Sequence, residues 1–187
     1  VHSCNAGFAQ FALDLGRDEI TATAQKVGFN KTITMDGIEC TPSLYEVDNA
    51  NDIDFGWSGI GQYNDTVNPF QYLTFMGAIA NNGVCVWPYL VEDIDSFSGF
   101  VKTVGTEKKR MMEKRSAKIL SDMMRKAVTD RYGDGNFSGL ELCAKTGTAE
   151  IGDKSTPHSW FVGFCREEEK PYAFVVVVEN AGAGLGA

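Results

Sequence analysis

Two short clusters of polar residues could perform chemistry. Ser3 and Asn5 flank Cys4 near the start of the chain, and the run Lys145-Thr146-Gly147-Thr148 closes a strand-like segment. An ammonium group and two hydroxyls can bind a carboxylate, because they supply positive charge and hydrogen-bond donors. The glycine between them has no side chain, so an extended ligand can approach the strand backbone there. The second cluster therefore has residue types suited to holding an extended ligand that carries a carboxylate.

Each cluster also has an ordinary structural interpretation. Serine and asparagine are common at helix starts, so Ser3 and Asn5 could form no more than a cap cluster. Glycine and threonine are ordinary choices where a strand leads into a turn, which is the alternative for the run at 145–148. Neither pattern alone identifies a functional site.

The residues around the first cluster predict two short helices. An apolar stripe with helical spacing precedes Gly16, and it consists of Phe8, Phe11, Ala12 and Leu15. Asn5 stands at the N-terminal edge of this helix. A second helix is predicted over 18–27, with Asp18 as its cap and Gly28 as its stop. Residues 30–65 show no sustained period and are predicted to be mostly loop with short strands.

The middle of the chain predicts two longer helices. Asn68-Pro69 supplies a cap and a first-turn proline, and Asn82-Gly83 closes that helix. Short strands are expected over 84–106. The basic residues Lys108, Lys109, Arg110, Lys114 and Arg115 are interpreted as a solvated helix start. A further amphipathic helix is predicted over 116–132, stopped by Gly133, with its paired methionines filling the core.

The last third of the chain predicts three strands, over 140–145, 159–165 and 172–179, joined as an antiparallel meander. The run from Phe174 to Val178 is apolar at every position, so both of its faces are expected to be covered. Helices packed on an antiparallel sheet make this an α+β fold in one domain.

Composition narrows the classes of partner and cofactor. The 187 residues include 17 basic and 25 acidic side chains, a net charge of −8 that disfavours nucleic acid. The five cysteines are Cys4, Cys40, Cys85, Cys143 and Cys165. No two of them form a C-x-x-C pair, and the chain has only two histidines, so it offers few metal ligands. We therefore predict no metal site and no cofactor. Isolated thiols, mostly buried, are expected, with Cys4 accessible beside the first cluster. The sequence shows no signal peptide or membrane-spanning segment.

The order of the motifs resembles the penicillin-binding transpeptidase family over nearly the whole chain. S-x-N and K-T-G belong to the signature that this family shares with serine β-lactamases. The remaining matching segments are Phe8 to Gly16, Ile60-Gly61-Gln62, Pro69-Phe70-Gln71, Ala78 to Val84, Ala144 to Ala149, His158 to Phe164 and Val177 to Asn180. Several spaced motifs in the right order are far more specific than one.

The resemblance implies a role for each site residue. Ser3 would stand in a proton relay, and the Asn5 amide would hold the amide of the substrate. Lys145, Thr146 and Thr148 would bind the terminal carboxylate of a D-alanyl-D-alanine peptide, with Gly147 open to its backbone. The Thr148 N–H would donate to the oxyanion of acyl transfer. The implied partners are the peptidoglycan stem peptide and β-lactams, and the implied fold is that of penicillin-binding proteins and serine β-lactamases.

The nucleophile of the family lies in an S-x-x-K motif, and no serine of this chain has a lysine three positions later. Residues 1–187 are therefore interpreted as one partial transpeptidase domain. It would lack the helix that carries the S-x-x-K motif and the C-terminal helix that closes the domain in this family. Such a chain is expected to be inactive alone, to leave an apolar groove uncovered, and to self-associate.

Two other functions remain open from the sequence. One is a serine β-lactamase or D,D-carboxypeptidase, which shares the same motifs; the Ile60-Gly61-Gln62 segment favours the transpeptidases. The other is a penicillin-sensing domain without turnover. In the leading interpretation the parent protein is bacterial, anchored to the cell membrane and active outside it, where peptidoglycan lies. Five thiols fit an oxidising exterior poorly.

Overall fold

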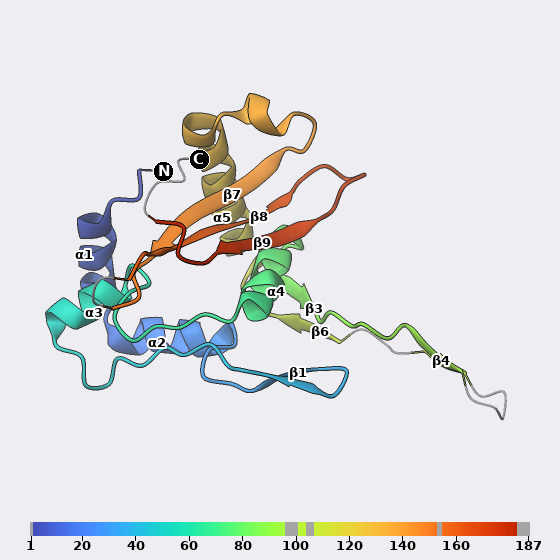
Figure 1. Cartoon of the computed structure of the whole chain (residues 1–187), viewed down its shortest axis with the longest axis horizontal. Helices are drawn as coiled ribbons and strands as arrows, with labels where there is room; N and C mark the ends of the chain where they lie inside the picture. The colour runs from blue at the N-terminus through green and yellow to red at the C-terminus, as the bar shows by residue number, and fades with distance from the viewer. Residues whose placement is uncertain (1, 96–100, 104–106, 153–154, 183–187) are drawn as a thin grey trace.

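A three-stranded antiparallel sheet forms the centre of the molecule (Figure 1). The computed structural model describes residues 2–95, 101–103, 107–152 and 155–182, and the side chains of 93–95 and 101–103 are not described. The strands are β7 (Leu142–Ala149), β8 (His158–Cys165) and β9 (Ala173–Val178), in the order β7-β8-β9. The predicted meander is confirmed, and it leaves β7 as an edge strand.

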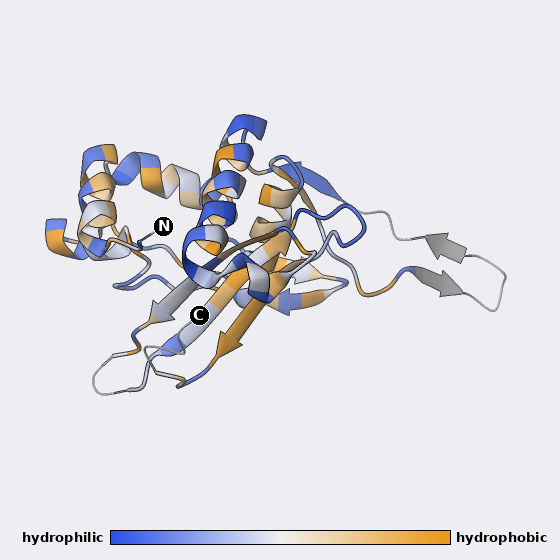
Figure 2. Ribbon diagram, turned by 90° about the horizontal axis from the view of Figure 1, so that it is seen from above, coloured by the Kyte–Doolittle hydropathy of each residue, from blue (hydrophilic) through white to orange (hydrophobic). Residues whose placement is uncertain are grey.

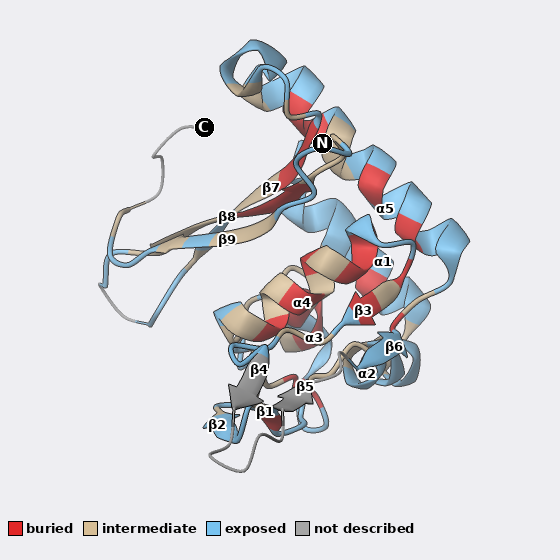
Figure 3. Ribbon diagram, turned by 90° about the vertical axis from the view of Figure 1, so that its right-hand side faces the viewer, coloured by how far each residue is buried: buried red, intermediate tan, exposed pale blue. Residues whose placement is uncertain are grey.

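Two helices cover one face of this sheet. Helix α4 (Pro69–Ala80) packs on β8 and β9, and α5 (Lys114–Ala127) packs on β7. The Asn68 side chain accepts a hydrogen bond from the Phe70 N–H, so the predicted cap of α4 is confirmed. The buried residues between the helices and the sheet are Met76, Ile79, Cys143, Val162 and Phe164. Figure 3 shows buried stretches in α4, α5, β7 and β8.

The opposite face of the sheet is covered only in part. A π-helical turn, η1 (Val128–Tyr132), and a 3-10 turn, η2 (Asp134–Phe137), continue from α5 over β7 and β8. Strand β9 is apolar along its length (Figure 2), yet Val176 and Val178 are 48% and 45% exposed. The prediction that both faces of β9 are covered is therefore wrong, because alternate side chains of β9 project beyond the reach of η1 and η2.

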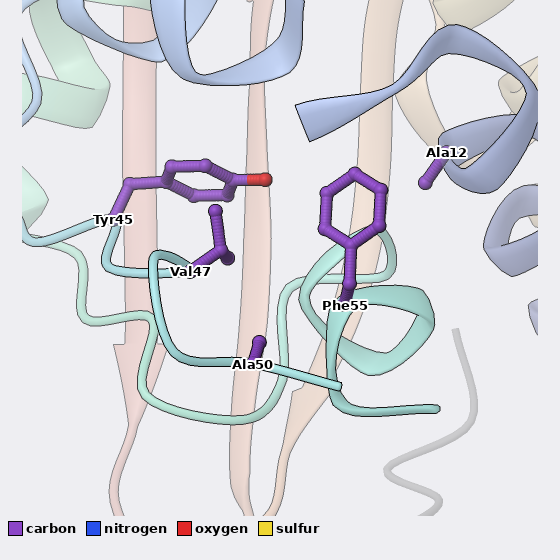
Figure 4. Packing of buried hydrophobic residues seen from close by; sticks show 5 residues of the cluster. All are labelled: Ala12, Tyr45, Val47, Ala50 and Phe55. Atoms are coloured by element: carbon purple, nitrogen blue, oxygen red, sulfur yellow. The ribbon is translucent and has the colours of Figure 1, made fainter. Parts of the chain in front are cut away.

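The first helices form a separate small core. Helix α1 (Asn5–Leu15) packs on α3 (Asp52–Ser58), and α2 (Arg17–Lys26) follows α1 directly. Figure 4 shows the buried residues of this core, which are Ala12, Tyr45, Val47, Ala50 and Phe55. The predicted stripe of α1 is largely unburied, since Phe8 and Phe11 are each 57% exposed.

Several local predictions need correction. Helix α3 falls in the predicted loop region, where the Asn51 side chain caps it by accepting from two backbone N–H groups. Asp18 lies inside the first turn of α2, and Gly16 takes the cap position. Gly28 follows the end of α2 as predicted.

The basic stretch is also different from the prediction. Residues 108–110 form strand β6 (Lys108–Arg110), which pairs with β3 (Val84–Val86) before α5 starts at Lys114. All three basic residues of β6 are exposed, as expected for solvated charges. The prediction that the paired methionines of α5 fill the core holds for Met124, which is partly buried against the sheet core, and is wrong for Met123, which is 61% exposed.

Two further hairpins are found among the described residues. Strand β1 (Ile33–Met35) pairs with β2 (Ile38–Cys40), and β4 (Asp93–Asp95) pairs with β5 (Val101–Thr103). The short strands predicted in these regions are thus confirmed, apart from the stretches outside the described residues.

Candidate active site on the edge of strand β7

The Lys145–Thr148 cluster lies within the second half of β7, on the free edge of the sheet. Thr146 pairs with Phe161 and Thr148 with Ser159 on the β8 side. The Thr146 N–H donates to the Tyr132 hydroxyl at 3.0 Å, and the Thr148 carbonyl accepts from Gln62 Nε2 at 3.3 Å. Both partners lie outside the sheet, so the backbone groups of Thr146 and Thr148 face away from β8. By the alternation of a strand, the Thr148 N–H points to this free edge as well.

The Lys145 ammonium also lies at this edge. Lys145 is half-buried, and its Nζ donates to the carbonyl oxygen of Thr146 at 2.6 Å. Since that carbonyl faces away from β8, the contact brings the positive charge to the open side of the strand. A ligand that pairs with β7 would meet this charge together with the Thr146 and Thr148 hydroxyls.

Gly147 is exposed, and the packing of the chain does not require a glycine there. Among the described residues, a Cβ at this position would meet only the Trp160 Cβ, at 3.5 Å, which is an ordinary contact. Trp160 stands opposite Gly147 on β8 and packs edge-on against Tyr72 of α4. The missing side chain therefore leaves space at the strand surface rather than preventing a clash inside the fold.

Tyr132 is a residue of this site that sequence reasoning missed. Its hydroxyl lies 3.0 Å from Thr146 Oγ1 and 3.0 Å from Thr146 N, and its ring packs edge-on against Phe161. The only signal in the sequence is its position before Gly133, which indicates a helix end but no contact with Thr146.

The Ser3-Cys4-Asn5 segment leads into α1 and is exposed. Cys4 takes the N-cap position and makes no side-chain capping bond, while Ser3 has a left-handed backbone with φ of 48°. The simple cap interpretation of this segment is therefore not supported. Cys4 is exposed, as expected, and Cys85 and Cys143 are buried.

Turn η1 contacts the β7 cluster and the residue that precedes Ser3. Arg131 Nη1 lies 3.1 Å from His2 Nδ1, and the neighbouring Tyr132 contacts Thr146. Within the described part of the chain, no hydrogen bond joins Ser3 or Asn5 directly to the residues of β7. Turn η1 thus contacts Thr146 of the β7 cluster and His2, the residue before Ser3, and the hydrogen bonds of the described residues do not join the two clusters to each other.

The Ile60-Gly61-Gln62 segment forms a second connection to the site. It follows α3, where Gly59 packs so closely on α1 that an added Cβ would lie 2.4 Å from the Ala12 Cβ. Gln62 then reaches the Thr148 carbonyl. This loop therefore ties the helical core of α1 and α3 to the edge of β7.

Asp65, just beyond this loop, has an unusual acidity. Burial raises the pKa of its carboxyl from 3.8 to about 7, although the Ser58 hydroxyl donates to it at 3.1 Å and opposes the shift. The nearby Tyr45 hydroxyl is buried and has no hydrogen-bond partner among the described residues. These groups belong to the core of the helical part and lie outside the β7 cluster.

Neither a metal cluster nor a membrane span is seen in the parts of the chain that the structure describes. No group of three or more His, Cys, Asp or Glu side chains is placed to hold a metal ion there. Likewise, none of the described helices has the length and apolar character needed to cross a bilayer.

The family follows from comparison of the whole chain with known proteins. A family model of the penicillin binding protein transpeptidase domain matches residues 1–187. The chain belongs to the penicillin-binding transpeptidase family. This confirms the resemblance inferred from the S-x-N and K-T-G motifs, and with it the α+β fold.

Individual members of the family are similar at modest identity. The peptidoglycan D,D-transpeptidase PbpA of Mycolicibacterium smegmatis is 31% identical over 99% of this chain and 38% of that protein. The crystal structure of PBPA from Mycobacterium tuberculosis superposes with a TM-score of 0.89 at 25% identity, covering 98% of this chain and 45% of the other. An imipenem acyl-enzyme complex of the same M. tuberculosis protein gives a TM-score of 0.87. The chain spans less than half the length of these penicillin-binding proteins.

Proposed function

We propose that this chain is the C-terminal portion of a D,D-transpeptidase domain that cross-links peptidoglycan through an acyl-serine intermediate and is acylated by β-lactams. The single observation that carries the proposal is the free edge of β7, where Lys145, Thr146 and Thr148 present their polar groups within a chain of this family. The similar proteins, which include D,D-transpeptidases and a β-lactam acyl-enzyme, support the same activity.

The β7 edge suits a peptide that ends in a carboxylate. Such a peptide can lie along the open side of β7 and pair with the backbone of Thr148 once Gln62 leaves the Thr148 carbonyl, and Gly147 leaves room for it. The Lys145 ammonium and the hydroxyls of Thr146 and Thr148 would bind the carboxylate. The Thr148 N–H, on the same edge, would donate to the oxyanion that forms when the carbonyl is attacked.

The first cluster would complete the machinery. Ser3 would pass the proton between the nucleophile and the leaving group, and the Asn5 side chain would hold the substrate amide. Both side chains are exposed, so a substrate can reach them. The nucleophile itself is proposed to be the serine of an S-x-x-K motif outside residues 1–187.

The exposed face of α1 supports a partial domain. Phe8, Phe11 and Leu15 share one stripe of this helix, and they are 57%, 57% and 47% exposed. Burial of apolar surface of this kind is favourable, so the stripe fits a surface that packs against another segment of the full domain. The parent protein is proposed to act outside the bacterial cell membrane and to be anchored there, because its substrate is extracytoplasmic.

The test is intact mass spectrometry after incubation with excess penicillin. The longer protein that contains the S-x-x-K motif should gain the mass of one β-lactam, and residues 1–187 alone should gain none. Slow release of the bound mass supports a transpeptidase, and rapid hydrolysis of penicillin supports a β-lactamase instead. If residues 1–187 alone become acylated, the proposed location of the nucleophile is wrong, and Ser3 and Cys4 are the first residues to examine.

A further inference from the structure

We propose that Tyr132 is a positioning residue, which holds the Thr146 hydroxyl so that its hydrogen points to the carboxylate of the ligand. This inference rests on the proposed function, in which Thr146 binds that carboxylate. It adds a residue that lies outside both sequence clusters and comes from η1.

Two hydrogen bonds join Tyr132 to Thr146, and one of them has a fixed direction. The Thr146 N–H can only donate, so the Tyr132 oxygen accepts this bond at 3.0 Å. The same oxygen lies 3.0 Å from Thr146 Oγ1, and either hydroxyl could donate to the other. A hydroxyl has one hydrogen and two lone pairs, so Tyr132 can accept from the amide and still donate to Thr146.

A bound carboxylate removes the remaining ambiguity. An ionised carboxylate only accepts hydrogen bonds, so Thr146 must use its single hydrogen to reach it. The bond between the two hydroxyls must then run from Tyr132 to Thr146. Tyr132 thereby supplies the hydrogen that Thr146 Oγ1 accepts, and it keeps the Thr146 amide on the free edge from being unpaired.

Tyr132 is held in place before any ligand arrives. The π-helical turn ends with a hydrogen bond from the Gly133 N–H to the Val128 carbonyl, and Val128 is fully buried. The Tyr132 ring packs edge-on on Phe161, with ring centres 5.9 Å apart, and its carbonyl accepts from the Asn136 side chain. Since Phe161, Asn136 and the Thr146 amide already hold Tyr132, little ordering is needed when Thr146 binds a carboxylate.

The turn itself is the reason that the phenol reaches β7. Regular α-helical structure stops at Ala127, and the wider π turn redirects the side chains that follow. The preceding residue of the same turn, Arg131, contacts His2 beside the Ser3 cluster. One turn therefore contacts the segments that hold both parts of the proposed site.

The decisive experiment compares Tyr132→Phe with the unchanged longer protein that contains the S-x-x-K motif. This variant removes one hydroxyl and keeps the ring on Phe161. We expect the second-order rate constant of acylation by penicillin to fall about tenfold, as for a lost hydrogen bond that supports a charged ligand. The fall should appear in the apparent binding constant and not in the limiting acylation rate, because Thr146 contacts the carboxylate and not the reacting carbonyl.

The second part of the experiment uses a penicillin whose carboxylate is esterified. Its ester group needs no such donor arrangement, so Tyr132→Phe and the unchanged protein should react with it at the same rate. Tyr45→Phe is the matched control, because that hydroxyl is buried in the other core and makes no hydrogen bond to a described residue. It should leave both reactions unchanged.

A double-mutant cycle covers the case in which Tyr132→Phe lowers stability. Adding Tyr132→Phe to Thr146→Val should cause no further loss of penicillin acylation, since the hydroxyl that Tyr132 orients is already gone. Three results would overturn the role of Tyr132. They are equal falls in the acylation rate constant with penicillin and with its ester, additive falls in the double-mutant cycle, and no fall at all. An unchanged longer protein that fails to react with penicillin would instead refute the proposed function on which this role rests.

Discussion

Lys145 donates from Nζ to the carbonyl oxygen of Thr146, the next residue along β7, at 2.6 Å. This contact turns the ammonium toward the free edge of the sheet, where the proposed ligand would pair. A positive charge held by a backbone carbonyl is available to a carboxylate without a competing acidic partner at that contact.

Replacing this charge should weaken acylation. In the longer protein, we expect Lys145→Gln to lower the rate constant of penicillin acylation by about 10- to 100-fold, since hydrogen bonds to charged groups contribute about 1.5–3 kcal/mol. Stopped-flow measurement with a fluorescent penicillin would detect this. Lys170→Gln is the control, because Lys170 also donates to a backbone carbonyl, that of Gly139, on a distant turn. A similar loss in both variants would contradict the assignment.

The two glycines of the sheet should respond differently to alanine. A Cβ at Gly163 of β8 would lie 2.2 Å from the Cys143 carbonyl oxygen, so Gly163→Ala should lower the free energy of unfolding by about 2 kcal/mol or more. Gly147→Ala meets no such obstacle, so the fold should be kept while penicillin acylation of the longer protein slows. Urea denaturation and acylation rates measured on both variants check the contrast. Substantial destabilisation by Gly147→Ala would show that this glycine serves packing.

The stability of the protein should depend on pH through Asp65. Its pKa is raised by burial to about 7 from 3.8, so the folded state keeps its proton over a range in which the unfolded state has lost it. The contribution of Asp65 to stability therefore decreases as pH rises from about 4 to about 7, and stays low above that. Asp65→Asn keeps an oxygen that can accept from the Ser58 hydroxyl.

We expect the stability of Asp65→Asn relative to the unchanged protein to increase with pH. Denaturant unfolding should show the variant gaining stability over the unchanged protein between pH 4 and 7, with the largest difference at pH 8. Asp48→Asn, at an exposed position, controls for the change in net charge. A difference between Asp65→Asn and the unchanged protein that is the same at pH 5 and pH 8 would contradict the raised pKa.

The apolar stripe of α1 should make residues 1–187 associate. Phe8→Gln with Phe11→Gln removes two side chains that are each 57% exposed, so little core packing is lost. Sedimentation velocity should show a larger share of monomer for the double variant. If the unchanged chain is already a monomer with one cooperative melting transition, the predicted self-association is wrong.

Local signals predicted much of the framework. The Asn68-Pro69 start of α4 and the three strands of the meander follow from caps, turn residues and apolar runs that act over a few residues. Helix α3 was missed because seven residues are too few to show a period, although Asn51 is a typical cap. The basic stretch at 108–110 became a strand because it pairs with β3, a partner that lies more than 20 residues away.

The sequence by itself determined the family and the residues of both clusters, because motif order and residue type are properties of the chain. Only the tertiary structure decided that Lys145–Thr148 lies on a free edge, that α1 exposes its apolar stripe, and that burial shifts the pKa of Asp65. It also brought Tyr132 to Thr146, fourteen residues further along the chain, through a π turn that no local pattern indicates. The physical reason is that edges, burial and such contacts depend on which segments pack together, and this is set by interactions between residues far apart in the chain.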